Sequence, residues 1–412
     1  MNQKKKSNRG SAEPAFLAVD FFCGAGGTTR GLIGAGGYVM AGIDKASGCR
    51  ETYIENNVNA FIDFSTPRYL DYDIFPASKA YPDGQQKKLL AELKELIPYY
   101  RGKAPHTPLL FAICAPCQPF TRLSRKELSE KRKTGRERDS NLLGEAVKFV
   151  TAFRPELVLS ENVRGIKDPK YGGIWDEFRA ALEKLGYLTG SKVVCTSRFG
   201  IAQFRKRSIL LAVRRELVKS ERLADHIGSE LLVPEADPDT VMVSVREAID
   251  HLPPIGAGET HDTVPNHRAR TLSVLNLQRL ASAAPGQSNA YMENTEFGDL
   301  SLDCHRKVNH RLKQRCFSDV YTRMHPDRPS PTITTKCHSI SNGRFGHYDT
   351  AQVRGISLRE AAILQSFPED YVFHPTEQIE PIARMIGNAV PPKLAAFFAD
   401  YLVRSIEGHV GR

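Results

Sequence analysis

The chain has 412 residues, 41% of them apolar, and its 57 basic and 47 acidic side chains give a formal net charge of +10. This length allows two domains with ordinary cores, and the excess positive charge suits a polyanionic partner such as nucleic acid. No apolar run reaches the roughly 18 residues of a membrane span, and eight irregularly spaced cysteines do not form a disulfide framework, which favours a reducing cytoplasm.

The N-terminal part predicts a basic tail followed by a ligand-binding loop. Residues 1–14 are basic without an apolar core, so we expect a disordered tail rather than a signal peptide. The apolar strand 16–22 runs into a turn that carries Gly24, Gly26 and Gly27 and opens a helix. Such glycines let a ligand approach the backbone, and the helix amides favour an electronegative group. The spacing is not the dinucleotide GxGxxG pattern, and a plain tight turn is an equal alternative.

A second strand, residues 38–43, ends at Asp44. A carboxylate about 20 residues beyond such a loop typically accepts hydrogen bonds from a ribose, although a helix N-cap is the alternative. The loop lacks a phosphate-binding Lys-Ser/Thr pair, so the two features together predict a nucleoside such as S-adenosylmethionine. Asp71 and Asp73 follow at the end of a third expected strand, and residues 85–100 have a helical pattern.

The central stretch is a strand that ends at cysteines. Residues 109–113 are all apolar, as in a strand buried on both faces of a parallel sheet. Beyond it, Pro116 and Pro119 bracket Cys117 and Gln118, so a stiff turn holds a thiol at the carboxyl edge of the sheet, where α/β proteins bind ligands. The pair Cys114 and Cys117 leaves a redox dithiol and a structural cysteine open as alternatives to a catalytic thiol.

Polar residues follow the next expected elements. A basic run after Gln118 is either a solvated surface or a loop beside a phosphate backbone. Helix 142–153 and strand 155–160 come next, and Glu161 directly after that strand should lie near Cys117, where partial burial would favour its protonated form. Helix 175–185 and strand 192–197 precede an extended segment in which Gln203, Arg205 and Arg207 alternate. We expect these three on one face, able to meet a phosphate or a base together.

From about residue 215 to 350 the helix and strand periodicity weakens, which predicts a second, less regular domain. Its basic residues, among them Arg323 and Lys336, are mixed with aromatic residues and histidines, a pattern suited to lying along DNA. Helix 358–367 and the apolar helix 394–406 end the chain, and the latter needs an apolar partner surface.

Five segments, taken in order, resemble the motifs of the bacterial DNA (cytosine-5) methyltransferase family, and the likeness covers nearly the whole chain. They are the loop from Asp20 to Gly27, the Pro116-Cys117-Gln118 turn, Glu161-Asn162-Val163, the Gln203-x-Arg205-x-Arg207 segment and Gly387-Asn388-Ala389-Val390. Each alone is weak, but their order with a variable region before Arg359 is specific. The redox interpretation of Cys117 therefore becomes minor.

The resemblance implies a Rossmann-like α/β S-adenosylmethionine-dependent methyltransferase fold with a smaller, irregular target-recognition domain. We expect a tail at 1–14, a catalytic domain at 15–225, a target-recognition domain at 226–380, and a return of 381–412 to the catalytic domain. It implies that Cys117 adds to C6 of a flipped cytosine, Glu161 stabilises the charge on the ring, Arg207 binds the base carbonyl and Arg205 holds the site through phosphates. The methyl group of S-adenosyl-L-methionine then goes to C5, leaving S-adenosyl-L-homocysteine.

The resemblance also implies the binding residues. The cofactor set is Phe22, Gly24, Gly26, Gly27, Asp44, Asp73, Pro116, Leu142, Asn388 and Val390. The DNA-contacting set is Gln118 and Gln203 from the motifs, with Arg323 and Lys336 chosen from the basic and aromatic mixture of the variable region. Asp63 and Asp71 compete with Asp73 for the adenine amine. We expect no metal, no membrane contact, a monomer acting on double-stranded DNA in the bacterial cytoplasm, and pairing with a restriction nuclease or anti-phage system. A transfer-RNA cytosine methyltransferase and a catalytically silent DNA-binding protein are the alternatives.

Overall fold

The computed structural model describes residues 13–116, 141–168, 173–217, 233–234, 236, 239–313 and 316–407. The chain divides into two compact units. Unit 1 comprises residues 1–193, 208–234 and 395–412, and unit 2 comprises residues 194–207 and 235–394. The expected tail overlaps the described part at its end, where Pro14 is buried and its carbonyl accepts a hydrogen bond from Thr107 Oγ1 at 3.5 Å.

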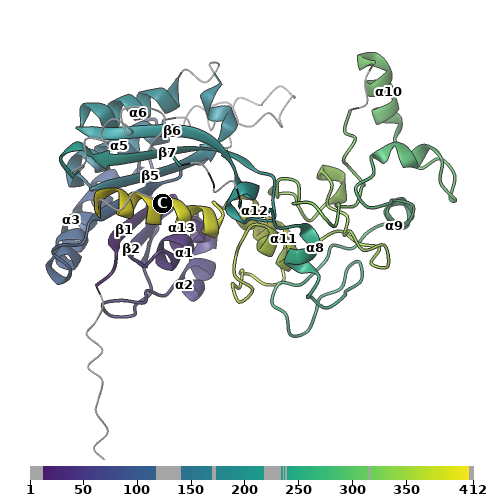
Figure 1. Cartoon of the computed structure of the whole chain (residues 1–412), viewed down its shortest axis with the longest axis horizontal. Helices are drawn as coiled ribbons and strands as arrows, with labels where there is room; N and C mark the ends of the chain where they lie inside the picture. The colour runs from purple at the N-terminus through teal and green to yellow at the C-terminus, as the bar shows by residue number, and fades with distance from the viewer. Residues whose placement is uncertain are drawn as a thin grey trace, which may run out of the picture. The chain divides into compact units, whose positions relative to one another are not determined.

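Unit 1 is organised around a sheet that has seven strands among the described residues, in the order β3-β2-β1-β4-β5-β7-β6 (Figure 1). The strands are β1 (Phe16–Phe21), β2 (Gly37–Ile43), β3 (Arg68–Leu70), β4 (Leu109–Ile113), β5 (Leu157–Val163), β6 (Tyr187–Cys195) and β7 (Lys206–Arg214). β1 pairs in parallel with both β2 and β4, so the strand order reverses between β1 and β4. Open α/β sheets bind ligands at such a reversal, outside the carboxyl ends of the strands.

Helices cover the sheet because its central strands are apolar on both faces. The helices of unit 1 are α1 (Gly27–Gly34), α2 (Arg50–Asn56), α3 (Gln86–Lys103), α5 (Leu142–Phe153), α6 (Ile174–Lys184) and α13 (Pro392–Glu407), whose residues from 395 onward belong to this unit (Figure 1). Apolar side chains of α3, α5 and α6 form one buried cluster with alternate residues of the strands, among them Leu17, Val19 and Phe111. This burial supplies the main stabilisation of the unit.

Unit 2 has little regular structure. Its helices are α8 (Val245–Ile249), α9 (Val274–Ala281), α10 (Asp303–Leu312), α11 (Leu358–Leu364) and α12 (Ile379–Asn388), and its strand pairing consists of isolated bridges. Short 3-10 helices in the two units lie at Ser47–Cys49, Arg164–Lys167, Thr196–Phe199, Arg215–Leu217, Asn289–Glu293 and Ile340–Asn342. Buried ionic groups replace part of the apolar core, since Arg354 and Glu360, each 1% exposed, are joined at 2.7 Å.

The expected elements are present, with some shifted bounds. The strand at 109–113 and the helix at 142–153 are confirmed. β5 continues through residues 161–163, so Glu161 lies inside this strand instead of after it. β6 begins at Tyr187, five residues before the predicted start at 192, and α11 ends at Leu364, before the predicted 367.

Candidate active site

The glycine-rich turn after β1 has the backbone that its sequence predicts. Phe22 leaves the strand with a φ of 63°, and Gly24 and Gly26 follow at 50° and 91°. Gly26 is the N-cap of α1, and no side chain caps the helix amides there. The turn therefore presents backbone N–H groups and a half-buried aromatic ring at the carboxyl end of β1.

Asp44 connects this turn to the end of β2. Its Oδ2 accepts a hydrogen bond from the Gly24 amide at 2.9 Å, and its Oδ1 accepts one from the Ala46 amide at 2.8 Å. Burial raises the pKa of Asp44, while these two hydrogen bonds oppose the shift. A carboxylate has about four acceptor sites, so Asp44 retains capacity for the hydroxyls of a ribose.

Asp20, which was not among the predicted site residues, connects β1 to the helix that follows the same turn. It is fully buried in β1, and its Oδ2 accepts the Thr29 hydroxyl at 2.7 Å, which also lies 3.1 Å from the Tyr53 hydroxyl. Oδ1 has no hydrogen-bond partner in the described part of the chain, and burial raises the pKa of Asp20 to about 7. The sequence does contain a signal for Asp20, because a carboxyl group inside an apolar strand is costly to bury and therefore indicates a special role.

The three aspartates that compete for an adenine amine differ in their surroundings. Asp63 already accepts from the Tyr38 hydroxyl at 2.8 Å and the Ser65 amide at 3.1 Å. Partial burial acts to raise its pKa, but the hydrogen bonds from Ser65 and Tyr38 outweigh it and lower the pKa. Asp71 is exposed, whereas Asp73 is buried just after β3, with Oδ2 3.9 Å from Lys45 Nζ. Asp73 also accepts a hydrogen bond, from the Phe75 amide at 3.1 Å, so the feature that distinguishes it from the other two is its burial.

The carboxyl ends of β4 and β5 bring Cys114 and Glu161 together. Ser160 Oγ donates to the Ile113 carbonyl at 2.6 Å, and Asn162 Nδ2 donates to the Ala115 carbonyl at 3.0 Å, which fixes the register across this edge. Desolvation raises the pKa of the Cys114 thiol well above its usual value, and the charge of Glu161 adds to the shift. Cys114 is therefore held as a thiol beside a carboxyl group that is itself 9% exposed.

The structure describes some of the other residues predicted at this edge and not others. Pro116 is half-buried, and Leu142 is 4% exposed and packs in the core cluster of unit 1. Cys117, Gln118 and the basic run that follows lie outside the described residues. The structure therefore places the neighbours of the predicted nucleophile.

In unit 2, Gln203 and Arg205 point into the protein. The expected alternation holds, because Gln203, Arg205 and Arg207 are 0%, 2% and 7% exposed while Phe204 and Lys206 are exposed. Gln203 Nε2 donates to Gln365 Oε1 at 2.5 Å, and its Oε1 accepts from the Ile333 amide at 2.9 Å. The expectation that Gln203 contacts DNA is wrong in this structure, since its amide is used in internal hydrogen bonds.

Arg205 joins two distant segments of unit 2. Its guanidinium donates to the carbonyl of Ile333 at 2.8 Å and to those of Gly387 and Ala389 at 3.0 and 3.3 Å. A phosphate-binding role does not agree with this arrangement, because the guanidinium is buried against backbone carbonyls. Arg205 instead anchors the closing motif, where Asn388 is exposed and Val390 is 8% exposed. Arg207, at the start of β7, donates to the Lys206 carbonyl at 2.8 Å.

The two basic residues selected from the variable region have opposite environments. Arg323 is fully buried and donates to four backbone carbonyls, those of Leu280, His347, Asp349 and Gln352. Burial lowers the pKa of Arg323 to about 10. Its predicted contact with DNA is therefore incorrect. Lys336 is exposed, with Nζ 3.6 Å from a carboxylate oxygen of Glu380, and its contact with DNA stays a prediction.

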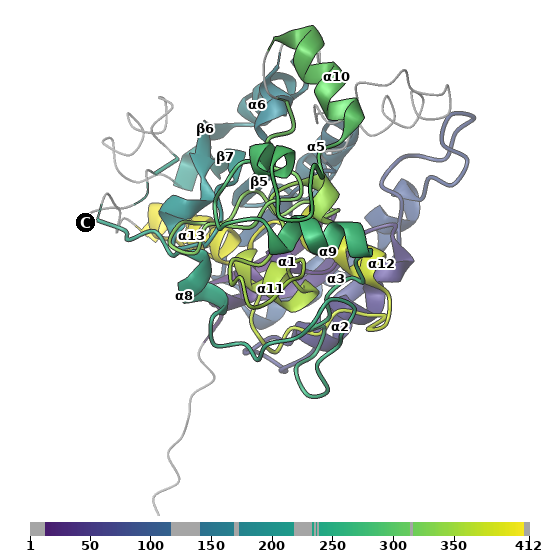
Figure 2. The ribbon, with the colours of Figure 1, turned by 90° about the vertical axis from the view of Figure 1, so that its right-hand side faces the viewer.

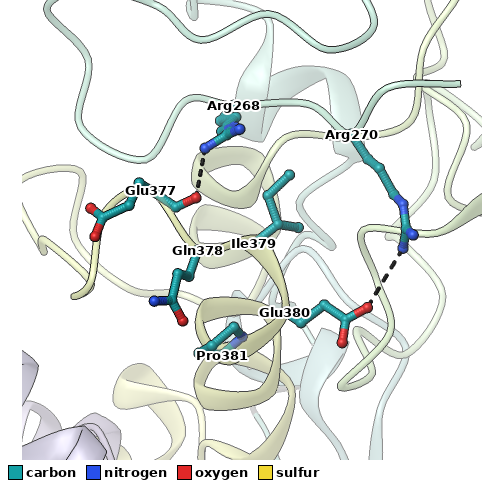
Figure 3. A pocket seen from close by; sticks show the side chains of 7 residues that line it. All are labelled: Arg268, Arg270, Glu377, Gln378, Ile379, Glu380 and Pro381. Atoms are coloured by element: carbon teal, nitrogen blue, oxygen red, sulfur yellow. Dashed lines mark hydrogen bonds and ion pairs between the residues drawn. The ribbon is translucent and has the colours of Figure 1, made fainter.

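A cavity of about 380 Å³ lies in unit 2 at the start of α12 and contains none of the predicted site residues (Figure 3). Arg268 Nη1 donates to the Glu377 carbonyl at 2.7 Å, and Arg270 lies 3.9 Å from Glu380. No group of three or more potential metal ligands occurs within the described ranges. In that same part of the chain, no helix has the length and apolar character needed to cross a membrane.

The chain is similar to known proteins over most of its length. Residues 99–404 match the family model "C-5 cytosine-specific DNA methylase". The Type II methylase M.HgiDII of Herpetosiphon aurantiacus is 33% identical over 95% of this chain and 96% of its own length, and the Type II methyltransferase M1.HphI of Haemophilus parahaemolyticus is 26% identical over 94% and 86%.

Solved structures resemble the fold. An E. coli prophage-encoded protein, assigned as a DNA modification methyltransferase, has a TM-score of 0.63 at 19% identity, over 96% of this chain and 100% of its own. The S. pombe Dnmt2 methyltransferase has a TM-score of 0.52 at 16% identity, over 94% and 98%. At these identities the likeness concerns the fold, and it confirms the predicted fold class.

Proposed function

We propose a reaction for this chain, which belongs to the C-5 cytosine-specific DNA methylase family. It methylates C5 of a flipped cytosine within a specific duplex sequence. The reaction proceeds through a covalent adduct between Cys117 and C6 of that cytosine. The enzyme class, DNA (cytosine-5-)-methyltransferase, follows from the family. The observation that carries the finer proposal is the order of Cys117, Glu161, Arg207 and Asn388 inside the matched residues 99–404.

Cytosine needs a nucleophile because C5 is unreactive while the ring is aromatic. The Cys117 thiolate adds to C6, forming a C–S bond and moving electron density toward C5 and N3. Glu161 donates or shares a proton at N3, and the Arg207 guanidinium binds the carbonyl oxygen O2. When bound, S-adenosyl-L-methionine supplies the methyl group. A base then removes the C5 proton, and the electron pair of that bond expels the Cys117 thiolate. A duplex hides C6, so the base must leave the stack.

The surroundings of Glu161 support its proposed role. Its place in β5, beside Cys114 and at 9% exposure, gives a carboxyl group with restricted access to water. Asn162 and Ser160, the residues on either side, bond to the β4 backbone and so restrict how the strand can move. A fixed, poorly solvated carboxyl is suited to sharing a proton with a base.

The first turn fits an S-adenosyl-L-methionine site. The uncapped amides of α1, the ring of Phe22 and the remaining acceptor capacity of Asp44 suit a nucleoside with a polar tail. We infer that Asp73 receives the adenine amine and that the rest of the predicted set, Gly24, Gly26, Gly27, Pro116, Leu142, Asn388 and Val390, completes the site. S-adenosyl-L-homocysteine is the expected product, and we propose no metal.

We propose unit 1 as the catalytic domain and unit 2 as the target-recognition domain, with the C-terminal helix returning to the former. The two units change over near residues 234 and 395, where we expected 225 and 381. Unit 2 also contains residues 194–207 with Arg207, and Asn388 and Val390, so part of the proposed catalytic and cofactor set belongs to it. A restriction-modification or anti-phage role, with the chain acting as a monomer alongside a nuclease, is the biological setting we infer. Its DNA substrate implies the bacterial cytoplasm.

The test is a methyl-transfer assay with labelled S-adenosyl-L-methionine on duplex DNA and on transfer RNA. We expect label in duplex DNA, at cytosine C5 of one recurring sequence when the modified DNA is sequenced. Label in transfer RNA alone would support the transfer-RNA alternative. No transfer to either substrate, with DNA binding retained, would support the catalytically silent alternative.

A further inference from the structure

Helix α10 (Asp303–Leu312) is the segment of unit 2 that the proposed site does not use. None of its ten residues is buried. Figures 1 and 2 both show it projecting from the rest of unit 2, beyond α9. A polar helix without a covering partner lacks the burial that normally stabilises a helix, so its surroundings must explain its position.

One side of α10 is attached to the neighbouring segment. Asn309 Oδ1 accepts a hydrogen bond from the Cys316 amide at 2.6 Å. The His305 ring stacks on Phe317, with centroids 5.3 Å apart and planes inclined at 27°. His305, Val308 and Asn309 are the half-buried residues of the helix, at three- and four-residue spacing, and so share one face. This attachment fixes which face points outward.

The outward face is positively charged. Lys307, His310 and Arg311 are exposed and, at spacings of three and four, lie together on the surface away from Asn309 and Val308. Asp303 lies on this same face, four residues before Lys307. Arg306 bonds to both Asp299 and Asp303, so it compensates one of these two negative charges, and Lys307 and Arg311 leave the region with an excess of positive charge. Among the described residues, no ion pair joins a carboxylate to Lys307 or Arg311, although Arg306 and then the charge of Lys307 contribute to lowering the pKa of Asp303.

We propose that α10 lies in the major groove of duplex DNA with this face, Lys307, His310 and Arg311, toward the bases and phosphates. The inference rests on the proposed function, which supplies the duplex. A helix of about 10–12 Å diameter fits a groove about 12 Å wide, and a lysine at the centre of the face can donate to guanine N7 and O6. Arg311 and His310, on either side, are placed for phosphates or neighbouring base edges.

Charge complementarity selects DNA over a protein partner. The outward face has no exposed large apolar side chain, since Leu312, the one large apolar residue of α10 that is exposed, lies on the turn side with His305. Protein interfaces have apolar centres and deplete lysine, whereas DNA-binding surfaces are polar and strongly positive. The outward face of α10 is polar and positively charged, as DNA-binding surfaces are.

The experiment uses the full chain with two double variants. Lys307→Ala with Arg311→Ala removes two charges from α10; Lys87→Ala with Lys94→Ala removes two exposed charges from α3 in unit 1 as the matched control. For each, duplex affinity is measured at several salt concentrations, together with S-adenosyl-L-methionine affinity, sedimentation, and the sequences methylated in a DNA library.

We expect the α10 variant to bind duplex DNA at least about tenfold more weakly and to lose one to two units, roughly, of salt slope. Its methylated sequences should become less restricted at one or more positions, while its cofactor affinity equals that of the wild type and the control retains every property. Equal behaviour of both variants, an affinity loss without any change in sequence preference, or a change in oligomeric state would each overturn the groove assignment. A wild-type chain that methylates no duplex would instead overturn the proposed function.

Discussion

Arg323 shows how a buried cation can stabilise an irregular domain. Its guanidinium reaches the Leu280 and His347 carbonyls at 3.0 and 2.8 Å, and those of Asp349 and Gln352 at 2.7 and 3.0 Å. One side chain thus joins α9 to a loop more than 60 residues later, because 280 and 349 lie 69 apart in the sequence. In the sequence, this arginine is indistinguishable from a DNA-contacting one, since both occur in polar, aperiodic surroundings.

We predict that Arg323→Ala destabilises the protein by at least about 3 kcal/mol, because each buried carbonyl left without a donor costs roughly 1–3 kcal/mol. Lys336→Ala, at an exposed position, should change the free energy of unfolding by less than about 0.5 kcal/mol. Denaturant unfolding of both variants measures the difference. Equal stabilities would show that Arg323 does not hold unit 2 together.

Asp20 predicts a pH dependence that involves the cofactor turn. Its folded pKa of about 7 lies above the usual 3.8, so the folded state binds the proton more tightly than the unfolded state. Stability from the protonated group is complete below about pH 4 and is lost as pH rises to about 7. Asp20→Asn keeps an acceptor for Thr29 but cannot ionise.

We therefore expect the stability of Asp20→Asn, relative to the wild type, to increase by up to about 4 kcal/mol between pH 4 and pH 7 and to change little above pH 7. Urea unfolding of the two proteins across this range is the measurement. A difference that does not vary with pH would mean that the pKa of Asp20 is the same in the folded and unfolded states, which would contradict this prediction.

At the level of elements, prediction succeeded where apolar burial controls the chain. β4 has five fully buried apolar residues and was located by that run alone. The predicted bounds of β5 and β6 differ from the observed ones because both strands contain buried polar residues. Ser160 and Asn162 bond to the β4 backbone, and Thr189 and Ser191 are 3% exposed within β6. A pattern of apolar residues cannot show that a neighbouring strand will satisfy polar ones.

Gly387, at the end of α12, has a carbonyl that accepts a hydrogen bond from Arg205, and a substitution there tests whether this helix end must stay in place. A Cβ at Gly387 would lie 2.3 Å from the Thr334 carbonyl carbon and the Thr335 amide nitrogen, so the helix end must move to accommodate it. We predict that Gly387→Ala costs about 1–3 kcal/mol of stability and weakens S-adenosyl-L-methionine binding, since Asn388 and Val390 would shift.

The matched control is Gly144→Ala in α5, where a Cβ meets nothing within 4 Å. Alanine favours a helix over glycine by about 1 kcal/mol, so this variant should be neutral or more stable. Thermal unfolding and calorimetric titration with S-adenosyl-L-methionine compare the two variants. If both retain full cofactor affinity, the closing motif does not take part in the cofactor site.

At the scale of the whole molecule, the sequence predicted an α/β unit and an irregular one, but not how the irregular one is held. Unit 1 follows from strands, helices and their apolar faces. Unit 2 depends on internal hydrogen bonds from Gln203, Arg205, Arg323 and Arg354, which reach Gln365, Ile333, Leu280 and Ile255 and so join positions far apart in the chain. Because such bonds have no periodicity, the sequence pattern assigned Gln203 and Arg323 to DNA contacts and Arg205 to phosphates. The order of the motifs still identified the family, since chemistry fixes those residue types.

The central claim is that Cys117 forms the bond to cytosine, and a covalent-trapping experiment tests it most directly. Duplex DNA containing 5-fluorocytosine at the target cannot release the enzyme, because fluorine replaces the proton whose loss expels the thiolate. With S-adenosyl-L-methionine, the wild type and Cys114→Ser should give a complex that survives denaturing electrophoresis, while Cys117→Ser should bind the DNA without forming it. An adduct that persists in Cys117→Ser and disappears in Cys114→Ser would contradict the account.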